Sequence, residues 1–200
     1  MALSGAELAT VQIHRGIAER ARSRMSDLDL KSANKPWNLN KAERNQQLAG
    51  IRAAYTPVVW SDMSFLAQTT TITKIGNCFE RACVFANYAR QEAQAINCQC
   101  HIYRVSFYAP LVAGIDHVVA VLVEPGVNLV ICNEPPNQTY NFDALGATGI
   151  VLDGWTEDWY FPNIGKTDKL RNNCWRMGTP FAEVTRIKYE DVPFYAQTSL

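Results

Sequence analysis

The segment that most constrains the fold is a run of small and apolar residues that begins at Cys78. Phe79 follows directly, and small side chains then recur at three- and four-residue steps: Ala82, Cys83, Ala86, Ala89 and Ala93. This spacing predicts a helix of about four turns with one narrow, small-residue face. Small side chains let other elements approach closely, so we expect this helix to be central. Gly76 and Asn77 come immediately before it and favour a turn at that point.

Two further helices are predicted before this segment. Ser4 and Glu7 have the spacing of a capping box, and apolar residues follow them at roughly helical intervals. Asn40 and Glu43 repeat that spacing at the start of a second helical pattern. Because both patterns precede the cysteine segment, residues 1–68 are expected to form an N-terminal helical layer.

Most of the remaining chain is predicted to form strands. Residues 98–112 and 116–135 are rich in β-branched and aromatic residues, and "EPGVN" in the second stretch is typical of a turn between two strands. Shorter strands are expected around "GIVLD" and at residues 182–189. Helices therefore come first and strands afterwards, which indicates an α+β fold. A chain of this length is expected to form a single domain, 1–200, with 69–200 as the catalytic core.

Charge and composition argue against several classes of protein. Nineteen basic residues balance nineteen acidic ones, so no net field attracts nucleic acid or an anionic membrane. No stretch approaches the roughly 18 apolar residues that a membrane span needs. The N-terminus lacks an apolar run behind a basic start, which argues against a cleavable signal peptide. Six cysteines are too few and too irregularly spaced for a disulfide framework, so a reducing cytoplasm is expected.

Cys78 stands where the start of a helix can activate a thiol. Only the thiolate is a useful nucleophile, and a free cysteine, with a pKa of about 8.5, is ionised to only a few per cent at neutral pH. The N–H groups and the positive dipole end of a first helical turn favour a thiolate and can also bind an oxyanion. The structural alternative is an ordinary buried cysteine. A partner base would decide between the two interpretations.

The base must be one of three histidines. His14 lies in the first predicted helix, where a surface or boundary residue is expected, and His101 lies on a predicted strand. His117 opens the apolar strand "HVVAVL" after the turn "AGID", so its ring can project from a strand end toward the start of the central helix. We therefore predict His117 as the partner of Cys78, with a purely structural histidine as the alternative.

An imidazole base also needs a third group that accepts a hydrogen bond from its second nitrogen. Two residues after His117 qualify, because Asn133 ends "VNLVICN" and Asp153 ends "GIVLD". Each also has a structural explanation. Asn133 can cap a turn before two prolines, and Asp153 forms a common turn dipeptide with Gly154. The residues by themselves leave both candidates open.

Two other features carry weaker signals. Cys98, Cys100 and His101 provide part of a zinc ligand set, but no second Cys/His pair stands at a fitting distance, so no metal is expected. On a strand, Cys98 and Cys100 share a face and are more simply core residues. Aromatic residues that follow Asp153 can either line a substrate cleft or belong to the core: Trp155, Trp159 and Tyr160.

Three motifs taken in order, "GNCFERACVFANYAR", "DHVVAVL" and "VLDGW", resemble the Cys–His–Asp signature of transglutaminase-like and papain-like cysteine hydrolases, especially bacterial virulence effectors of that superfamily. The likeness covers roughly residues 74–160. It implies a papain-like or transglutaminase-like core, in which the helix that carries the cysteine packs on an antiparallel sheet. It also implies that Cys78 is the nucleophile, His117 the general base and acid, and Asp153, ahead of Asn133, the orienting carboxylate.

The sequence departs from the family pattern at two places. Gly154 stands where a proline is more usual after the acid, although Trp155 matches the tryptophan that follows. Ile72 occupies the position at which papain-type enzymes carry a glutamine before the nucleophile. The oxyanion donors are then expected to be the backbone N–H groups of Cys78 and a neighbour, with the Asn77 side chain as an auxiliary donor.

The resemblance implies a cysteine-dependent acyl-transfer enzyme that acts on a protein substrate through a thioester and needs no cofactor. Glutamine deamidation and transglutamination are favoured over proteolysis of the papain type. A non-catalytic binding module on the same fold is the alternative from another class. The likeness to effectors is compatible with a host protein as the substrate and with delivery into the host cytoplasm by a dedicated export system.

Overall fold

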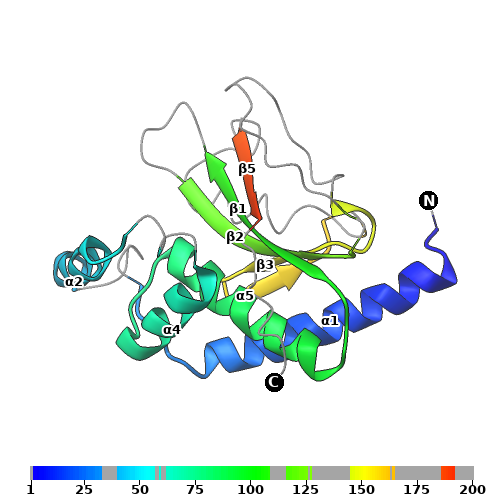
Figure 1. Cartoon of the computed structure of the whole chain (residues 1–200), viewed down its shortest axis with the longest axis horizontal. Helices are drawn as coiled ribbons and strands as arrows, with labels where there is room; N and C mark the ends of the chain where they lie inside the picture. Colours follow the sequence, from blue (N-terminus) through cyan, green and yellow to red (C-terminus); the bar gives the residue numbers. More distant parts are fainter. Residues whose placement is uncertain are drawn as a thin grey trace.

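The computed structural model describes residues 2–32, 40–56, 59, 62–108, 116–125, 127, 145–162, 164 and 186–191. In this part of the chain, four α-helices are followed by the strands of a five-stranded sheet (Figure 1). This order confirms the predicted α+β class. The helices lie together on one side of the sheet (Figure 1).

The first two helices begin where the sequence predicts. At the start of α1 (Gly5–Ser26) the capping box is complete, because the Ser4 N–H donates to Glu7 Oε2 at 2.7 Å and the Glu7 N–H donates to Ser4 Oγ at 3.2 Å. The second helix, α2 (Lys41–Ala53), starts directly after Asn40, but the Asn40 side chain makes no cap hydrogen bond. The second capping pattern therefore marks the start of a helix although the predicted cap is not formed.

The sequence pattern does not predict α4 (Met63–Thr73). The sequence has three successive threonines at 69–71, and β-branched residues of this kind favour strands over helices. The helix forms because Asp62 Oδ1 accepts from the Phe65 N–H at 3.0 Å and because its apolar side packs against the neighbouring helix. Threonine hydroxyls donate to carbonyl oxygens one turn earlier. The boundary predicted after residue 68, between the helical layer and the core, therefore falls inside this helix.

The cysteine helix, α5 (Cys78–Ala95), is central, as predicted. It packs against α1 and α4 and against the sheet (Figure 1). The small residues of its predicted face are buried: Ala82, Cys83, Ala86, Ala89 and Ala93. Two charged residues of its first turns, Glu80 and Arg81, are buried as well, which the pattern does not predict. A Cβ at Gly76 would lie 2.7 Å from Glu80 Cβ, so glycine permits the tight approach just before the helix.

Neighbouring strands of the sheet are antiparallel, in the order β4-β3-β2-β1-β5. Their bounds are β1 (His101–Tyr108), β2 (Asp116–Val123), β3 (Ile150–Asp153), β4 (Asp158–Tyr160) and β5 (Arg186–Asp191). The first three match predicted strands, whereas the short β4 is not predicted. The last strand, β5, overlaps the strand predicted at 182–189, of which 182–185 lie outside the described residues. The strand predicted after "EPGVN" also lies outside them.

The sheet is buried on both faces. Even-numbered strand residues pack with the helices: Ile102, Ala120, Leu122, Ile150 and Leu152. Odd-numbered residues form a second apolar cluster on the other face, together with Leu145 and Tyr160: Tyr103, Val105, Val119, Val121, Val123 and Val151. Burial on both faces explains why "HVVAVL" reads as a continuous apolar run rather than an alternating pattern.

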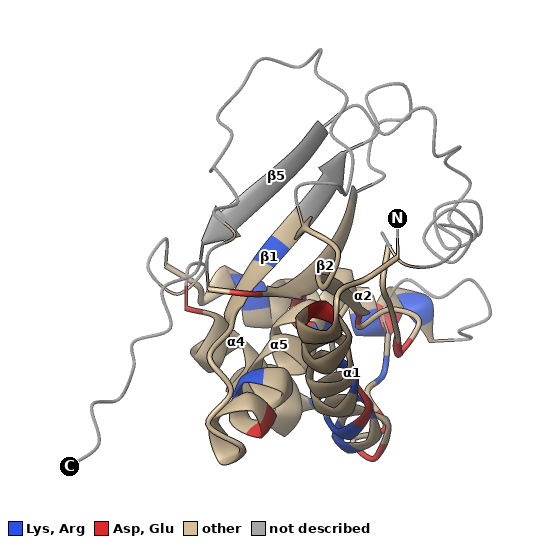
Figure 2. Ribbon diagram, turned by 90° about the vertical axis from the view of Figure 1, so that its right-hand side faces the viewer, with Lys and Arg blue, Asp and Glu red and all other residues tan. Residues whose placement is uncertain are grey.

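Charged residues of both signs are spread along the helices in the ribbon of Figure 2. This distribution agrees with the even balance of nineteen basic and nineteen acidic residues. Within the described ranges, none of the helices has the length and apolar character needed to cross a bilayer.

Candidate active site

Three of the predicted site residues lie at the ends of neighbouring elements. Cys78 is the first residue of α5, His117 the second residue of β2 and Asp153 the last residue of β3. Strands β2 and β3 pair with Ala120 opposite Leu152, which brings the start of β2 beside the end of β3. His117 Nε2 and Asp153 Oδ2 are 3.1 Å apart, and both side chains are buried.

The electrostatics of this site favour a protonated His117. Burial by itself lowers the pKa of His117, but the charge and hydrogen bond of Asp153 outweigh burial, and the hydrogen bond and charge of Cys78 add to their effect. The pKa of His117 is thereby raised to about 10. Burial raises the pKa of Asp153, while the charge and hydrogen bond of His117 lower it by more, so it lies below its ordinary value. At neutral pH the site therefore holds an imidazolium and a carboxylate.

Cys78 also acts on His117, because its thiol contributes to the raised pKa of the imidazole. It is half-buried and thus partly open to solvent. The N–H groups of Cys78 and Phe79 belong to the first turn of α5, where no earlier helical carbonyl accepts them. The dipole of an 18-residue helix also favours negative charge at this end. The start of α5 and the His117 imidazolium thus both present positive charge to Cys78.

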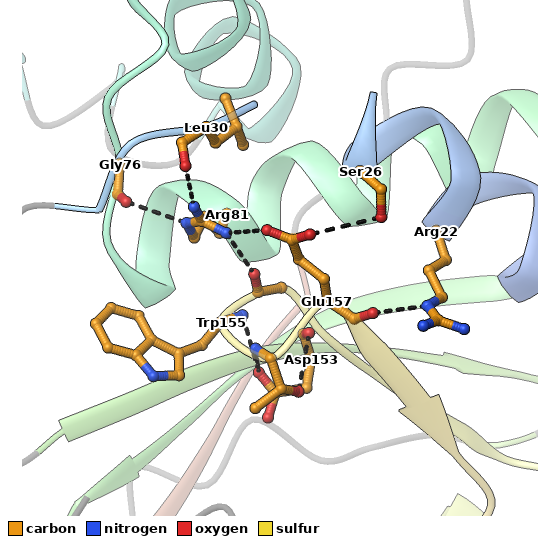
Figure 3. Close-up of polar contacts among 10 residues, drawn as sticks. Arg22, Ser26, Leu30, Gly76, Arg81, Asp153, Trp155 and Glu157 are labelled. Carbon is orange, nitrogen blue, oxygen red and sulfur yellow. Dashed lines mark hydrogen bonds and ion pairs between the residues drawn. The ribbon is translucent and has the colours of Figure 1, made fainter. Parts of the chain in front are cut away.

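Asp153 is oriented by the turn that follows it. Its Oδ1 accepts hydrogen bonds from the main-chain N–H groups of Trp155 at 3.0 Å and Thr156 at 3.4 Å (Figure 3). Its other oxygen, Oδ2, is the one that meets His117. The two carboxylate oxygens therefore have separate tasks, one to anchor the side chain and one to hold the imidazole.

Gly154, the departure from the family pattern, has a structural reason. A Cβ at this position would lie 2.6 Å from the main-chain carbon of Arg81 in α5. Because the turn after Asp153 approaches the backbone of the cysteine helix so closely, a side chain at this position would clash, and a proline ring is excluded on the same ground.

A second ion pair, between the buried Glu80 and the half-buried Arg52, lies beside Cys78. Glu80 Oε1 and Oε2 accept from Arg52 Nε at 2.7 Å and Nη2 at 2.9 Å, and Oε2 also accepts from the Asn77 N–H at 3.0 Å. Burial lowers the pKa of Arg52, but the hydrogen bonds and charge of Glu80, together with the charge of Cys78, raise it above its ordinary value. Arg52 thus attracts a thiolate at Cys78, although the carboxylate of Glu80 offsets much of that attraction.

The remaining predicted site residues have different surroundings. Asn77 is buried as the N-cap residue of α5, and its use as an oxyanion donor stays a prediction. Asn133 lies outside the described residues. Trp159 is half-buried and packs against the helical side of the core, and Tyr160 is buried in the second cluster. Trp155 is half-buried, and its indole points away from the polar contacts drawn around Arg81 and Glu157 (Figure 3).

The other two histidines have structural contacts. His14 is buried, and its Nδ1 lies 2.9 Å from the Thr148 carbonyl oxygen, so the expectation of a surface or boundary residue is wrong. Its burial follows from the contact between α1 and the segment before β3. Burial lowers the pKa of His14. His101 lies at the start of β1, where its Nδ1 is 3.2 Å from the Tyr103 hydroxyl.

Cys98 and Cys100 precede β1 instead of lying on the predicted strand, and both pack partly buried against the helical side of the core. Burial raises the pKa of the Cys100 thiol to about 12. Among the residues that the structure describes, no group of three or more His, Cys, Asp or Glu side chains is arranged to hold a metal ion.

Of the charged residues that surround the site, only Glu80 has a local signal in the sequence. Asn77 and Glu80 have the spacing of a capping box, which indicates a carboxylate folded back onto the start of the helix. The sequence around Arg52, Arg81 and Glu157 contains no such spacing, so it does not distinguish these residues from charged residues on a solvent-exposed surface.

No protein-family model, no curated protein and no solved structure matches the chain. The chemical interpretation of the site therefore depends on the geometry and electrostatics of its own residues.

Proposed function

We propose that the protein is a cysteine-dependent acyl-transfer enzyme with Cys78 as nucleophile, His117 as general acid and base, and Asp153 as the orienting carboxylate. One observation carries the proposal: a buried histidine lies 3.1 Å from a buried carboxylate, and a half-buried thiol at the start of a helix acts on the same histidine. A thiol, an imidazole and a carboxylate in this order are the groups that acyl transfer requires.

In the first half of the proposed reaction, the Cys78 thiolate attacks the carbonyl carbon of a carboxamide and an S–C bond forms. The N–H groups of Cys78 and Phe79 are the proposed donors to the resulting oxyanion, with the Asn77 side chain as an auxiliary donor. The His117 imidazolium then protonates the leaving nitrogen. The C–N bond breaks, and ammonia leaves behind a thioester on Cys78.

In the second half, the neutral His117 takes a proton from the acceptor as the acceptor attacks the thioester. Water as the acceptor yields a carboxylic acid, which then loses its proton to the solvent, and a primary amine yields a new amide. In both cases the S–C bond breaks and the thiolate–imidazolium pair returns. All other protons are carried by these side chains, so the proposed cycle uses no cofactor.

The proposed substrate is the side-chain carboxamide of glutamine in a protein. The resemblance to transglutaminase-like effectors supports this choice and supports a host protein as the target. Deamidation and transglutamination share the first half-reaction and differ only in the acceptor, so one assay can test both. Cleavage of a backbone amide would use the same residues and would release a peptide amine instead of ammonia.

The test is to incubate wild-type protein and Cys78→Ala with cell lysate and to search the proteins by mass spectrometry. We expect deamidated glutamine or isopeptide-linked lysine with the wild type and neither with Cys78→Ala. New chain termini that depend on Cys78 would assign proteolysis instead. If the two samples are identical while both proteins capture the same partner, the chain is a binding module.

A direct test of the site uses dilute iodoacetamide at about pH 6, where ordinary cysteines are protonated. We expect Cys78 to be alkylated well before the other five of the six cysteines. His117→Ala should remove this selectivity because the thiolate loses its counter-ion. Uniformly slow labelling of all the cysteines in the wild type would contradict the proposal.

A further inference from the structure

Arg81 is a buried cation surrounded by acceptors from three parts of the chain (Figure 3). Its side chain is only 1% exposed, although it lies close to the start of α5. Nε donates to the Gly76 carbonyl oxygen at 3.3 Å, and Nη2 donates to the Leu30 carbonyl oxygen. Nη1 donates to the Gly154 carbonyl oxygen at 3.2 Å and to Glu157 Oε1 at 2.8 Å.

These acceptors belong to segments whose relative placement defines the candidate site. Gly76 precedes the cysteine helix, Leu30 follows α1, and Gly154 and Glu157 lie in the turn after Asp153. A guanidinium is planar and presents its N–H donors in fixed directions. One side chain therefore sets the distance and orientation between the start of α5 and the turn that carries the carboxylate.

Glu157 holds that turn from its other side. Its φ of 55° is in the left-handed region, which is uncommon for a residue other than glycine. Besides the bond to Arg81, its main-chain oxygen accepts from Arg22 Nε at 2.8 Å, and Ser26 Oγ lies 3.5 Å from its Oε2. Contacts from α1 and α5 thus support the conformation of a turn whose N–H groups orient the Asp153 carboxylate.

We propose that Arg81 and Glu157 form a positioning clamp, which fixes the turn after Asp153 against the start of α5 and so holds His117 between Asp153 and Cys78. Neither residue of the clamp touches a reacting atom, so both are positioning residues. The benefit of the clamp to catalysis rests on the proposed function. The effect of the clamp on the position of His117 is independent of that function, because the clamp is present whether or not the protein turns over a substrate.

The clamp is tested with Glu157→Gln, and Glu92→Gln serves as the matched control. Glu157 has a partly exposed side chain, so the nearly isosteric change is expected to leave the protein folded. The control removes a carboxylate from a different ion pair of α5, the one that Glu92 makes with Arg20. Circular dichroism and thermal unfolding establish that both variants are folded.

Two measurements report on the site itself: the pKa of His117 from an NMR titration of its ring, and the rate constant for alkylation of Cys78 by iodoacetamide. In Glu157→Gln we expect the pKa of His117 to fall by about one unit or more because its carboxylate partner is displaced. We expect alkylation at about pH 6 to slow by roughly tenfold or more. Glu92→Gln should match the wild type in both measurements.

Arg81→Lys provides a second variant that keeps the charge but replaces the planar fork by a single ammonium group. It should change both measurements in the same direction as Glu157→Gln. Because either single variant already disrupts the contact between the two side chains, the double variant should lose less than the sum of the two single losses. Additive losses would contradict a shared clamp.

A wild-type pKa of His117 and a wild-type alkylation rate in Glu157→Gln would overturn the clamp and leave the proposed function intact. Equal changes in Glu157→Gln and Glu92→Gln would overturn it as well, because the effect would then be a general one on stability. If Cys78 of the wild type proves no more reactive than the other cysteines, the proposed function fails, and the NMR titration still decides whether the clamp exists.

Discussion

The two ends of α5 are both held by ion pairs, but they differ in access to water. Near the C-terminal end, Glu92 accepts from Arg20 at 2.9 Å and Arg24 at 3.0 Å, and these arginine side chains are 48% and 42% exposed. Near the N-terminal end, Glu80 and Arg81 are each only 1% exposed, and their partners Arg52 and Glu157 are 34% and 32% exposed. Water can solvate the arginines that Glu92 binds when their contacts are lost, whereas it has little access to the side chains of Glu80 and Arg81.

The difference shows how one helix serves two purposes. Its small residues form the core against which α1, α4 and the sheet pack, and its first turns hold a polar network around Cys78. Buried charges cost free energy unless each is paired. Loss of any one contact is therefore expected to destabilise the protein. We therefore expect changes at the first turns to have large effects and changes near Glu92 to have small ones.

The largest effect is expected from Cys78→Ala, compared with Cys83→Ala further along the same helix. Loss of the proposed nucleophile should lower the rate of the acyl-transfer reaction by roughly 10³-fold or more. Cys83 is buried in the core, so its replacement should cost about 1 kcal/mol of unfolding free energy and leave the reaction in place. Ammonia release from a glutamine substrate measures the first effect and urea denaturation the second. If both variants lost activity equally, the two cysteines would not have the different roles assigned to them.

The next largest effect concerns the buried pair at the centre of the site. Asp153→Ala leaves the imidazolium of His117 in the interior without its carboxylate, which should lower the unfolding free energy by about 3 to 5 kcal/mol at neutral pH. Urea denaturation followed by circular dichroism measures the change. A loss below about 1 kcal/mol, the range of a surface pair, would mean that the pair is not buried in solution.

The stability contributed by the same pair should depend on pH on both sides of neutrality. The pKa of His117 is raised from 6.5 to about 10, so its contribution is complete below about pH 6.5 and is lost as the pH rises toward 10. The pKa of Asp153 is lowered from 3.8, so its contribution is complete above about pH 4 and is lost as the pH falls further. The difference in unfolding free energy between wild type and Asp153→Asn should therefore be largest between these limits. A difference that rises steadily above pH 7 would contradict this assignment.

A smaller effect is expected from Glu80→Gln. The amide accepts less strongly from Arg52 and from the Asn77 N–H, and the half-buried guanidinium loses its counter-charge, at a cost of about 1 to 3 kcal/mol. Glu43→Gln on α2 is the matched control, because its contact with Gln47 is exposed. Thermal unfolding of the two variants provides the comparison, and similar midpoints would show that burial does not strengthen the Glu80 contacts.

The smallest effect is expected at the other end of the helix. Glu92→Gln should cost about 0 to 1 kcal/mol, because exposed arginine partners are solvated when the pair is lost. The loss should shrink further in high salt, which screens exposed charges. Denaturation at low and high ionic strength measures it. A cost as large as that of Glu80→Gln would remove the contrast between the two ends of α5.

Local patterns in the sequence predicted much of the fold. Ser4 and Glu7 predicted the start of α1, and the small residues after Cys78 predicted a central buried helix. No helix is predicted at α4, because three threonines favour a strand and the helix depends on packing against α5 as well as on the Asp62 cap. The expectation for His14 is wrong, because its burial follows from a partner, Thr148, that is far away in the sequence.

By itself, the sequence determined that a thiol stands at the start of a helix, a histidine at the start of a strand and an aspartate at the end of another, because each is a local signal. The tertiary structure decided that His117 and Asp153 meet at 3.1 Å and that Arg81 joins the turn after Asp153 to the cysteine helix. Those contacts depend on the register between β2 and β3 and on the close approach of Gly154 to α5. They join residues far apart in the chain, so no local pattern encodes them.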